Sequence, residues 1–165
     1  MSEVKEPKLS KILVAIDGSE QSMHAADYAI DMATKYNAEL IAIHVVSAKL
    51  LGFEYTPQPM LFNLPATPNT VNNITETSKR EAERWLDRIK QQLLEHGPKK
   101  VKLKTEVIIA IKPLIAGEIV DYAQQENVDL IVIGTKGRSG FKRLLLGSVA
   151  LGVVTYAHCP VMVTK

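Results

Sequence analysis

The chain has 165 residues, of which 46% are hydrophobic and 23% are charged. This length and composition are typical of one soluble globular domain, and they exclude a collagen-like repeat and a disordered chain. The formal net charge of +2 is too small to indicate a dedicated nucleic-acid or membrane-surface protein. We therefore expect a single domain that spans residues 1–165.

Three features predict a cytoplasmic location. Cys159 is the single cysteine, so an intrachain disulfide cannot form. The first ten residues are polar and charged, which differs from the apolar core of a signal peptide. No apolar run approaches the roughly 20 residues that cross a bilayer, so we do not expect a membrane protein.

The first part of the chain predicts a β-α-β unit. An apolar run at residues 12–16 ends at Asp17 and predicts a strand that is buried on both faces. Ser19 predicts the N-cap of a helix, whose apolar residues recur at helical spacing until Asn37. Residues 40–46 repeat the buried-strand pattern, so the two strands should be parallel with a right-handed crossover.

Residues 47–77 predict a long loop without regular structure. The stretch is rich in Asn and Thr, and it is interrupted by Pro57, Pro59, Pro65 and Pro68. Loops of this length form lids, contact surfaces or disordered segments, and the sequence does not choose among them. A helix follows and closes at Gly97. Its apolar stripe, which predicts a core-facing side, comprises Ala82, Trp85, Leu86, Ile89 and Leu93.

The second half alternates strands with helices. Residues 101–107 alternate apolar and charged side chains, which predicts a strand exposed on one face and therefore a sheet edge. Pro113 predicts the start of a third helix, with an inner face formed by Ile115, Ile119 and Ala123. A buried strand at 130–133, a helix from about Gly147 to Ala157 and a short strand at 160–164 follow. The pattern is typical of an α/β fold, a doubly wound parallel sheet with helices on both faces.

The ends of the two most buried strands indicate a ligand site. In an open parallel sheet, ligands bind beyond the carboxyl ends of the strands, where neighbouring connections leave toward opposite faces. Asp17 and Gly134 should border that crevice. The Asp17 carboxylate suits a hydrogen bond from a ribose hydroxyl, and it can also simply anchor its own turn. Both interpretations stay open.

The segment after the 130–133 strand suits a phosphate group. Gly134, Gly137 and Gly147 allow backbone N–H groups to approach an anion, and the helix that begins near Ser148 adds further donors. A glycine-rich loop can also serve only as a turn, and Ser148 can be a helix cap. The cations of this segment, which either attract a polyphosphate or form a solvated rim, are Lys136, Arg138, Lys142 and Arg143. Phe141 is the single aromatic residue among them and the net charge of the chain is small, so a nucleic-acid role is not favoured.

At these residues the chain resembles the universal stress protein family, in particular its ATP-binding branch. The family signature is Gly-x-x-Gly, nine residues, then Gly-Ser or Gly-Thr; here it is met by Gly134, Gly137, Gly147 and Ser148. The resemblance extends to residues 11–19 and 158–161. It implies a Rossmann-like five-stranded parallel sheet of order 3-2-1-4-5, which agrees with the edge character of the third strand. It also implies a homodimer paired through the last strand, at Val161, Met162 and Val163.

The resemblance also implies a nucleotide-binding site, residue by residue. It places Asp17 at the ribose, and it places backbone around adenine at Ala15, Ile16 and Val45. The residues that it places at the phosphates are Gly134, Gly137, Gly147, Ser148 and Val149. Ile133, Lys136 and Arg138 are additional candidates for the same site. The implied ligand is ATP, alone or with Mg²⁺.

Three functions remain open for such a chain. The first is a regulatory module of the stress response that binds ATP and hydrolyses it slowly at most; the second is an ATPase; the third is a nucleotide-free dimeric scaffold. The chain has neither a Gly-x-x-x-x-Gly-Lys-Ser/Thr loop nor a Gly-x-Ser-x-Gly elbow. We assign no metal site and no catalytic residue, because the adjacent His158 and Cys159 lack further ligands. His44 is interpreted as a hydrogen-bonded core histidine.

Overall fold

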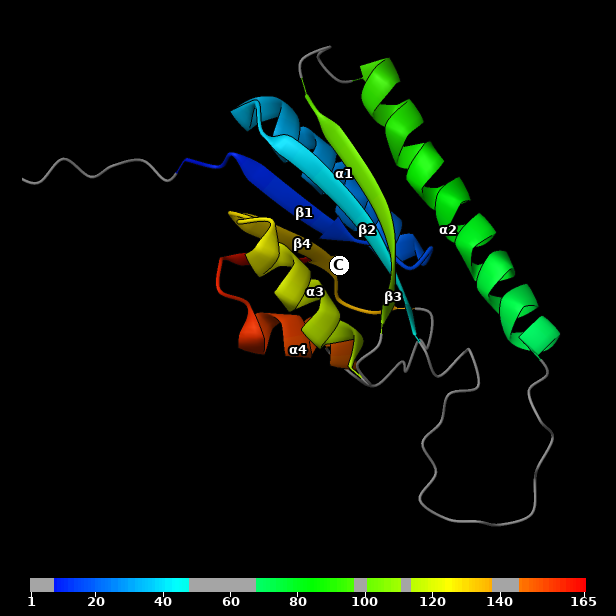
Figure 1. The fold of residues 1–165 in the computed structure, drawn as a ribbon. Coiled ribbons are helices and arrows are strands. Elements are labelled where there is room, and N and C mark those ends of the chain that lie inside the picture. The colour runs from blue at the N-terminus through cyan, green and yellow to red at the C-terminus, as the bar shows by residue number, and fades with distance from the viewer. Residues whose placement is uncertain (1–7, 48–67, 97–100, 111–113, 138–145) are drawn as a thin grey trace, which may run out of the picture.

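The computed structural model describes residues 8–47, 68–96, 101–110, 114–137 and 146–165. All of its strands are parallel and form one sheet of order β3-β2-β1-β4-β5 (Figure 1). The predicted fold class and strand order are therefore confirmed. The elements, in chain order, are β1 (Lys11–Ala15), α1 (Glu20–Tyr36), β2 (Glu39–Ser47), α2 (Pro68–His96), β3 (Leu103–Ala110), α3 (Ile115–Gln125), β4 (Leu130–Gly134), α4 (Ser148–Tyr156) and β5 (Val161–Thr164).

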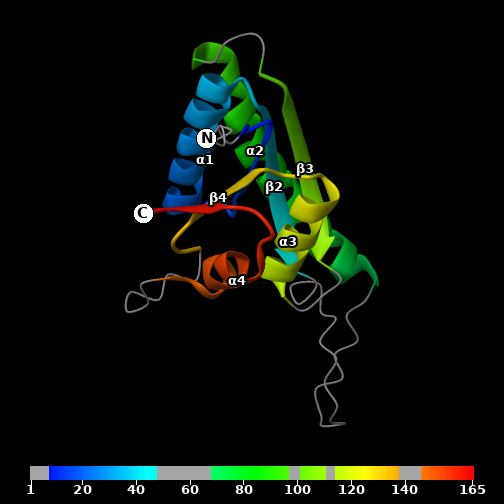
Figure 2. The same cartoon turned by 90° about the vertical axis from the view of Figure 1, so that its left-hand side faces the viewer.

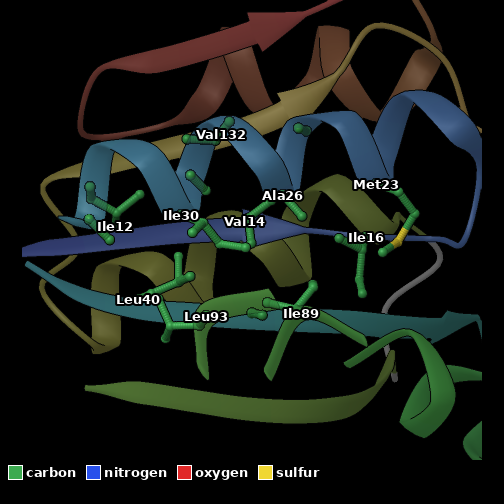
Figure 3. Close-up of a cluster of buried hydrophobic side chains, with 14 of the residues drawn as sticks. Ile12, Val14, Ile16, Met23, Ala26, Ile30, Leu40, Ile89, Leu93 and Val132 are labelled. Atoms are coloured by element: carbon green, nitrogen blue, oxygen red, sulfur yellow. The ribbon is translucent and has the colours of Figure 1, made fainter. Parts of the chain in front are cut away.

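Helices cover both faces of the sheet, with α1 and α2 on one face and α3 and α4 on the other (Figure 2). Successive side chains of a strand point to opposite faces, so β1 supplies Ile12 and Val14 to one core and Leu13 to the other. Figure 3 shows the first core, in which β1 side chains meet Met23, Ala26 and other residues of α1. Burial on both faces explains why β4, and β1 after Lys11, are continuously apolar.

The strand order reverses at β1. The chain moves outward from β1 through β2 to β3, and then returns to the other side of β1 to form β4 and β5. The connections that follow β1 and β4 therefore leave toward opposite faces of the sheet, α1 on one and α4 on the other. Such a switch point leaves a crevice at the carboxyl ends of the two strands. This crevice between β1 and β4 is the one predicted from the sequence.

The limits of α1 follow from local chemistry, as predicted. Ser19 is the N-cap, and its side chain accepts a hydrogen bond from the backbone N–H of Ser22. Asn37 is the C-cap and has a left-handed backbone (φ 50°), a conformation that Asn tolerates better than most residues. These caps satisfy backbone groups that the helix itself leaves unpaired.

Two predicted helix starts were wrong. Helix α2 begins at Pro68, inside the segment that was predicted to be irregular up to residue 77. A proline fits the first turn of a helix because its missing N–H would have no partner there, so Pro68 starts the helix. Helix α3 begins at Ile115 after an extended Leu114, whereas Pro113 was predicted to open it. Pro113 itself, and residues 48–67 of the predicted loop, lie outside the described residues.

The remaining elements are present as predicted, but β3 covers Leu103–Ala110 rather than residues 101–107. β3 lies at a sheet edge and most of its residues are only partly buried. Helix α4 spans nearly the expected residues. Among the described residues, no helix combines the length and the apolar character needed to traverse a bilayer.

Candidate functional site

A pocket of about 290 Å³ lies at the carboxyl ends of β1, β2 and β4. Because the strands are parallel, these ends meet at one edge of the sheet (Figure 1). The described residues that line the pocket are Ala15, Ile16, Asp17, Ser22, His44, Val45, Val46, Ser47, Ser78, Glu81, Ile115, Ile119, Ile133, Gly134, Thr135, Lys136, Gly137, Gly147, Ser148, Val149 and Ala150.

The pocket has one apolar wall and one polar wall. Val45, Ile115 and Ile133 form the apolar wall and continue the core between the sheet and α3. The polar wall lies on the side of α1 and α2 and includes His44, Ser78 and Glu81. The alternation of side chains along β2 separates the two, because His44 and Val45 point to opposite faces. This combination of an apolar surface with a few polar groups is typical of a small-molecule site.

Asp17 connects the turn after β1 to the pocket. Its Oδ1 accepts hydrogen bonds from Ser19, at 3.0 Å from the backbone N and 2.6 Å from Oγ. Its own N–H donates to Ser22 Oγ at 3.2 Å. A Cβ at Gly137 would overlap Asp17 Oδ2, so this second oxygen lies against Gly137. The structure thus confirms the turn-anchoring interpretation and also places the carboxylate in the pocket lining.

The three glycines of the signature lie around the end of β4 for different steric reasons. A Cβ at Gly134 would lie 2.9 Å from the carbonyl oxygen of Gln21, so β4 approaches α1 too closely for a side chain. A Cβ at Gly147 would lie 3.2 Å from the carbonyl oxygen of Thr135, to which the Gly147 N–H donates at 2.7 Å. Only at Gly137 is the contacting group a pocket side chain, Asp17.

The start of α4 corrects one prediction. Gly147 occupies the N-cap position, and Ser148 is the first residue of the helix and is exposed. The interpretation of Ser148 as the cap is therefore wrong, because the extended backbone of an N-cap is found one residue earlier. Glycine brings no side chain to cap the first turn. Residues 147–150 line the pocket, so the N-terminus of α4 faces it with its partial positive charge.

The structure brings eleven of the twelve predicted site residues together in the pocket lining: Ala15, Ile16, Asp17, Val45, Ile133, Gly134, Lys136, Gly137, Gly147, Ser148 and Val149. The twelfth, Arg138, lies outside the described residues, as do Lys142 and Arg143 of the same basic segment. Asp17 and Ser148, from opposite halves of the chain, border one pocket. The predicted dimer residues belong to β5 and are not part of this lining.

Several lining residues were missed by the sequence analysis. Ile115 and Ile119 have the helical spacing of a core stripe, and nothing in the sequence shows that this stripe ends at a pocket. Ser78 lies directly after the predicted loop at 47–77 and outside the apolar stripe of the following helix, so it was not considered. Its position three residues before Glu81 on one helix could have indicated a shared face.

His44 is hydrogen-bonded as predicted, but it is not a core residue. Its Nδ1 donates to the carbonyl oxygen of Ile16 at 2.7 Å, and its half-buried ring lines the pocket. The ring also packs edge-on against Trp85, with centroids 5.2 Å apart. Cys159 is separate from the site, and burial raises the pKa of its thiol, which does not suit a nucleophile.

Comparison with known proteins identifies the family. The sequence profile of the universal stress protein family matches residues 8–165. The chain belongs to the universal stress protein family. A universal stress protein of Methanocaldococcus jannaschii is 39% identical over 155 residues, which cover 94% of this chain and 81% of that protein. The universal stress protein YxiE of Bacillus subtilis is 33% identical, over 94% of this chain and 99% of that protein.

Solved structures of universal stress proteins share the fold. UspA from Lactobacillus plantarum superimposes with a TM-score of 0.74 at 29% identity, over 97% of this chain and 100% of that chain. One universal stress protein of the same fold was solved in complex with cAMP (TM-score 0.66, 20% identity, 96% of this chain and 98% of that chain). Another, from Archaeoglobus fulgidus, was solved in complex with dAMP (TM-score 0.59, 18% identity, 96% of this chain and 99% of that chain).

Proposed function

We propose that this universal stress protein binds an adenine nucleotide, with ATP as its ligand, and acts as a single-domain regulatory module. The observation that carries the proposal is the pocket at the β1–β4 switch point, where Asp17 and Gly137 lie against each other. The site has no assigned catalytic residue, so we expect a change of conformation or association to be the output. The expected location is the cytoplasm, where a single unpaired cysteine stays reduced.

Each part of the pocket matches one part of a nucleotide. The apolar wall of Val45, Ile115 and Ile133 suits the flat faces of adenine. The Asp17 carboxylate suits a ribose hydroxyl, because an ionised carboxylate only accepts hydrogen bonds. The backbone around Gly137 and the N-terminus of α4 suit phosphate, which prefers N–H donors and positive potential.

Relatives support the choice of an adenine nucleotide. The two complexes with cAMP and dAMP both carry adenine, and both proteins have the fold described above. Lys136 lines the phosphate side of the pocket and would add a positive charge there. Among the described residues, no group of three or more His, Cys, Asp or Glu side chains could hold a metal ion. Mg²⁺ would accompany ATP through phosphate oxygens and water, as it does in many nucleotide sites.

We further propose that two copies pair through β5. This strand is at an edge of the sheet within the part of the chain that the structure describes. Val161, Met162 and Val163 are only partly buried, and the neighbouring helix α4 exposes Leu151 and Val154. An open strand edge next to exposed apolar side chains is a surface that a second copy can cover.

Two measurements test nucleotide binding. One uses the protein as isolated, and the other titrates ATP into the nucleotide-free protein. Heating should release an adenine nucleotide that mass spectrometry identifies, and calorimetry of the nucleotide-free protein should show saturable ATP binding. Gly137→Val should weaken ATP binding by at least about tenfold, because its side chain would displace the Asp17 carboxylate and fill the phosphate side.

The matched control is Gly117→Ala on α3. Gly117 does not line the pocket, and a Cβ there would meet nothing within 4 Å, so ATP affinity should not change. An unaltered ATP affinity in Gly137→Val would contradict the placement of the phosphates. The absence of any ATP binding to the unsubstituted protein would contradict the proposed function and favour a nucleotide-free scaffold.

A further inference from the structure

The turn that carries Asp17 depends on Gly18. Gly18 has a φ of +77°, in the left-handed region that residues with a Cβ rarely adopt. This conformation directs the chain from β1 into α1 and leaves the Asp17 carboxylate at the pocket. The orientation of the carboxylate is therefore determined by whatever holds this turn.

Trp85 of α2 covers the turn. A Cβ at Gly18 would overlap the atoms of the Trp85 indole, so the ring packs directly on the glycine backbone. Trp85 is partly buried and packs against the core between the sheet and helices α1 and α2. Trp85 is not part of the pocket lining. Any effect of Trp85 on a ligand must therefore pass through its neighbours.

His44 holds the other side of the same turn. Its Nδ1 donates to the carbonyl oxygen of Ile16, the residue before Asp17. The His44 and Trp85 rings meet edge-on, with an interplanar angle of 79°, an arrangement that stabilises aromatic pairs. Asp17 is thus flanked by two residues, Ile16 and Gly18, whose backbones are both contacted by this ring pair.

We propose that Trp85 is a positioning residue for nucleotide binding, which holds the Asp17 carboxylate in its binding orientation through Gly18 and His44. This inference rests on the proposed function, because its readout is ATP affinity. It also gives α2 a role beyond the core. Ser78 and Glu81, which lie seven and four residues before Trp85 on the same helix, line the pocket directly. The position of α2 and the occupancy of the pocket should therefore depend on each other.

A double-mutant cycle tests this role. Trp85→Leu keeps an apolar side chain but removes the flat ring from Gly18, and it should weaken ATP binding about tenfold by calorimetry. In the Asp17→Ala background the same substitution should change ATP affinity less than about twofold, because the group that Trp85 positions is gone. Trp85→Phe keeps an aromatic ring and should restore affinity to within about threefold of the unsubstituted protein.

The control is Ile89→Val, one turn further along α2. Ile89 is fully buried in the same core but belongs to neither the pocket nor the turn, so ATP affinity should be unchanged. Urea unfolding of every variant identifies the folded fraction, and affinities are compared per folded molecule. A purely structural role of Trp85 would lower stability without this selective coupling to Asp17.

The fluorescence of Trp85 gives a second measurement, because Trp85 is the only tryptophan of the chain. ATP should change its fluorescence emission, and at saturating ATP this change should be smaller in Asp17→Ala. Equal losses of ATP affinity on Trp85→Leu with and without Asp17, or no loss at all, would overturn this inference while the proposed function stands. The absence of ATP binding to the unsubstituted protein would instead overturn the proposed function, and this inference with it.

Discussion

At the scale of single residues, the glycine signature combines two kinds of constraint. Gly134 and Gly147 lie against backbone atoms of Gln21 and Thr135, so their lack of a side chain is needed for packing. Gly137 lies against the Asp17 carboxylate, so its lack of a side chain leaves room for a pocket residue. A motif that predicts a ligand site therefore also contains residues that the fold itself requires.

The packing role of Gly134 leads to a stability prediction. Gly134→Ala places a Cβ 2.9 Å from a main-chain oxygen that cannot move away cheaply, and it should lower the free energy of unfolding by about 1–3 kcal/mol. Gly117→Ala, in the first turn of helix α3 where a Cβ would meet nothing within 4 Å, should raise it by about 0.5 kcal/mol, because alanine favours helix. Urea denaturation measures both. Equal stabilities of the two variants would contradict the close packing of β4 against α1.

At the scale of elements, polar side chains attach the edge strand β3 to α3. Tyr122 of α3 donates a hydrogen bond to Glu106 Oε2 of β3 at 2.6 Å, and Lys104 Nζ donates to Glu126 Oε1 at 2.9 Å. The hydrogen bond from Lys104 lowers the pKa of the Glu126 carboxyl. Burial, together with the bond to Glu106, raises the pKa of Tyr122 to about 12. Because α3 supplies a wall of the pocket, these bonds also help to set the position of that wall.

The raised pKa of Tyr122 predicts a dependence of stability on alkaline pH. A group whose folded pKa exceeds its unfolded value contributes stability that is present below the unfolded pKa and is lost as pH rises through the folded pKa. For Tyr122 this loss should occur between pH 10 and about 12. Tyr122→Phe should lower the free energy of unfolding at pH 7 by about 1 kcal/mol and reduce the further loss between pH 10 and 12.

Tyr156→Phe is the matched control, because it makes the same substitution at a residue that is 70% exposed. Its unfolding free energy should follow the unsubstituted protein at every pH. The measurement is thermal or urea unfolding from pH 7 to 12. If Tyr122→Phe kept the full alkaline loss of stability, the Tyr122–Glu106 bond would not be its source.

At the scale of the whole molecule, the direction of the β5 backbone predicts how the proposed dimer can be disrupted. The carbonyl oxygens of Pro160 and Thr164 accept hydrogen bonds from Ile131 and Thr135 on the side of β4. Backbone groups alternate in direction along a strand, so those of Val163 point to the open edge. That edge is where a second copy would add its own strand.

Val163→Pro should therefore convert the dimer to a monomer, because proline removes an edge N–H donor but spares the hydrogen bonds to β4. Val163→Ala truncates the same side chain and keeps the N–H, so it should remain dimeric. Sedimentation of the variants at equal concentration measures the difference. A monomeric unsubstituted protein, or a dimeric and folded Val163→Pro, would rule out pairing through β5.

Much of the architecture could be predicted because it depends on local periodicity. The continuous apolar runs predicted the buried strands, the alternation at 101–107 predicted an edge strand, and the caps Ser19 and Asn37 predicted the limits of α1. The spacing of glycines placed the candidate site at the end of β4. In each case the information lies within a few neighbouring residues, since side-chain period and capping are properties of one element.

By itself, then, the sequence determined the fold class, the sheet edge at β3 and one end of the pocket. Only the tertiary structure decided that α2 begins at Pro68 and reaches the carboxyl ends of the strands, and that Trp85 packs on Gly18 beside Asp17. An apolar stripe shows which face of a helix is buried but not which distant residues it contacts. Those contacts depend on how the elements pack across the sheet, and no local pattern records that packing.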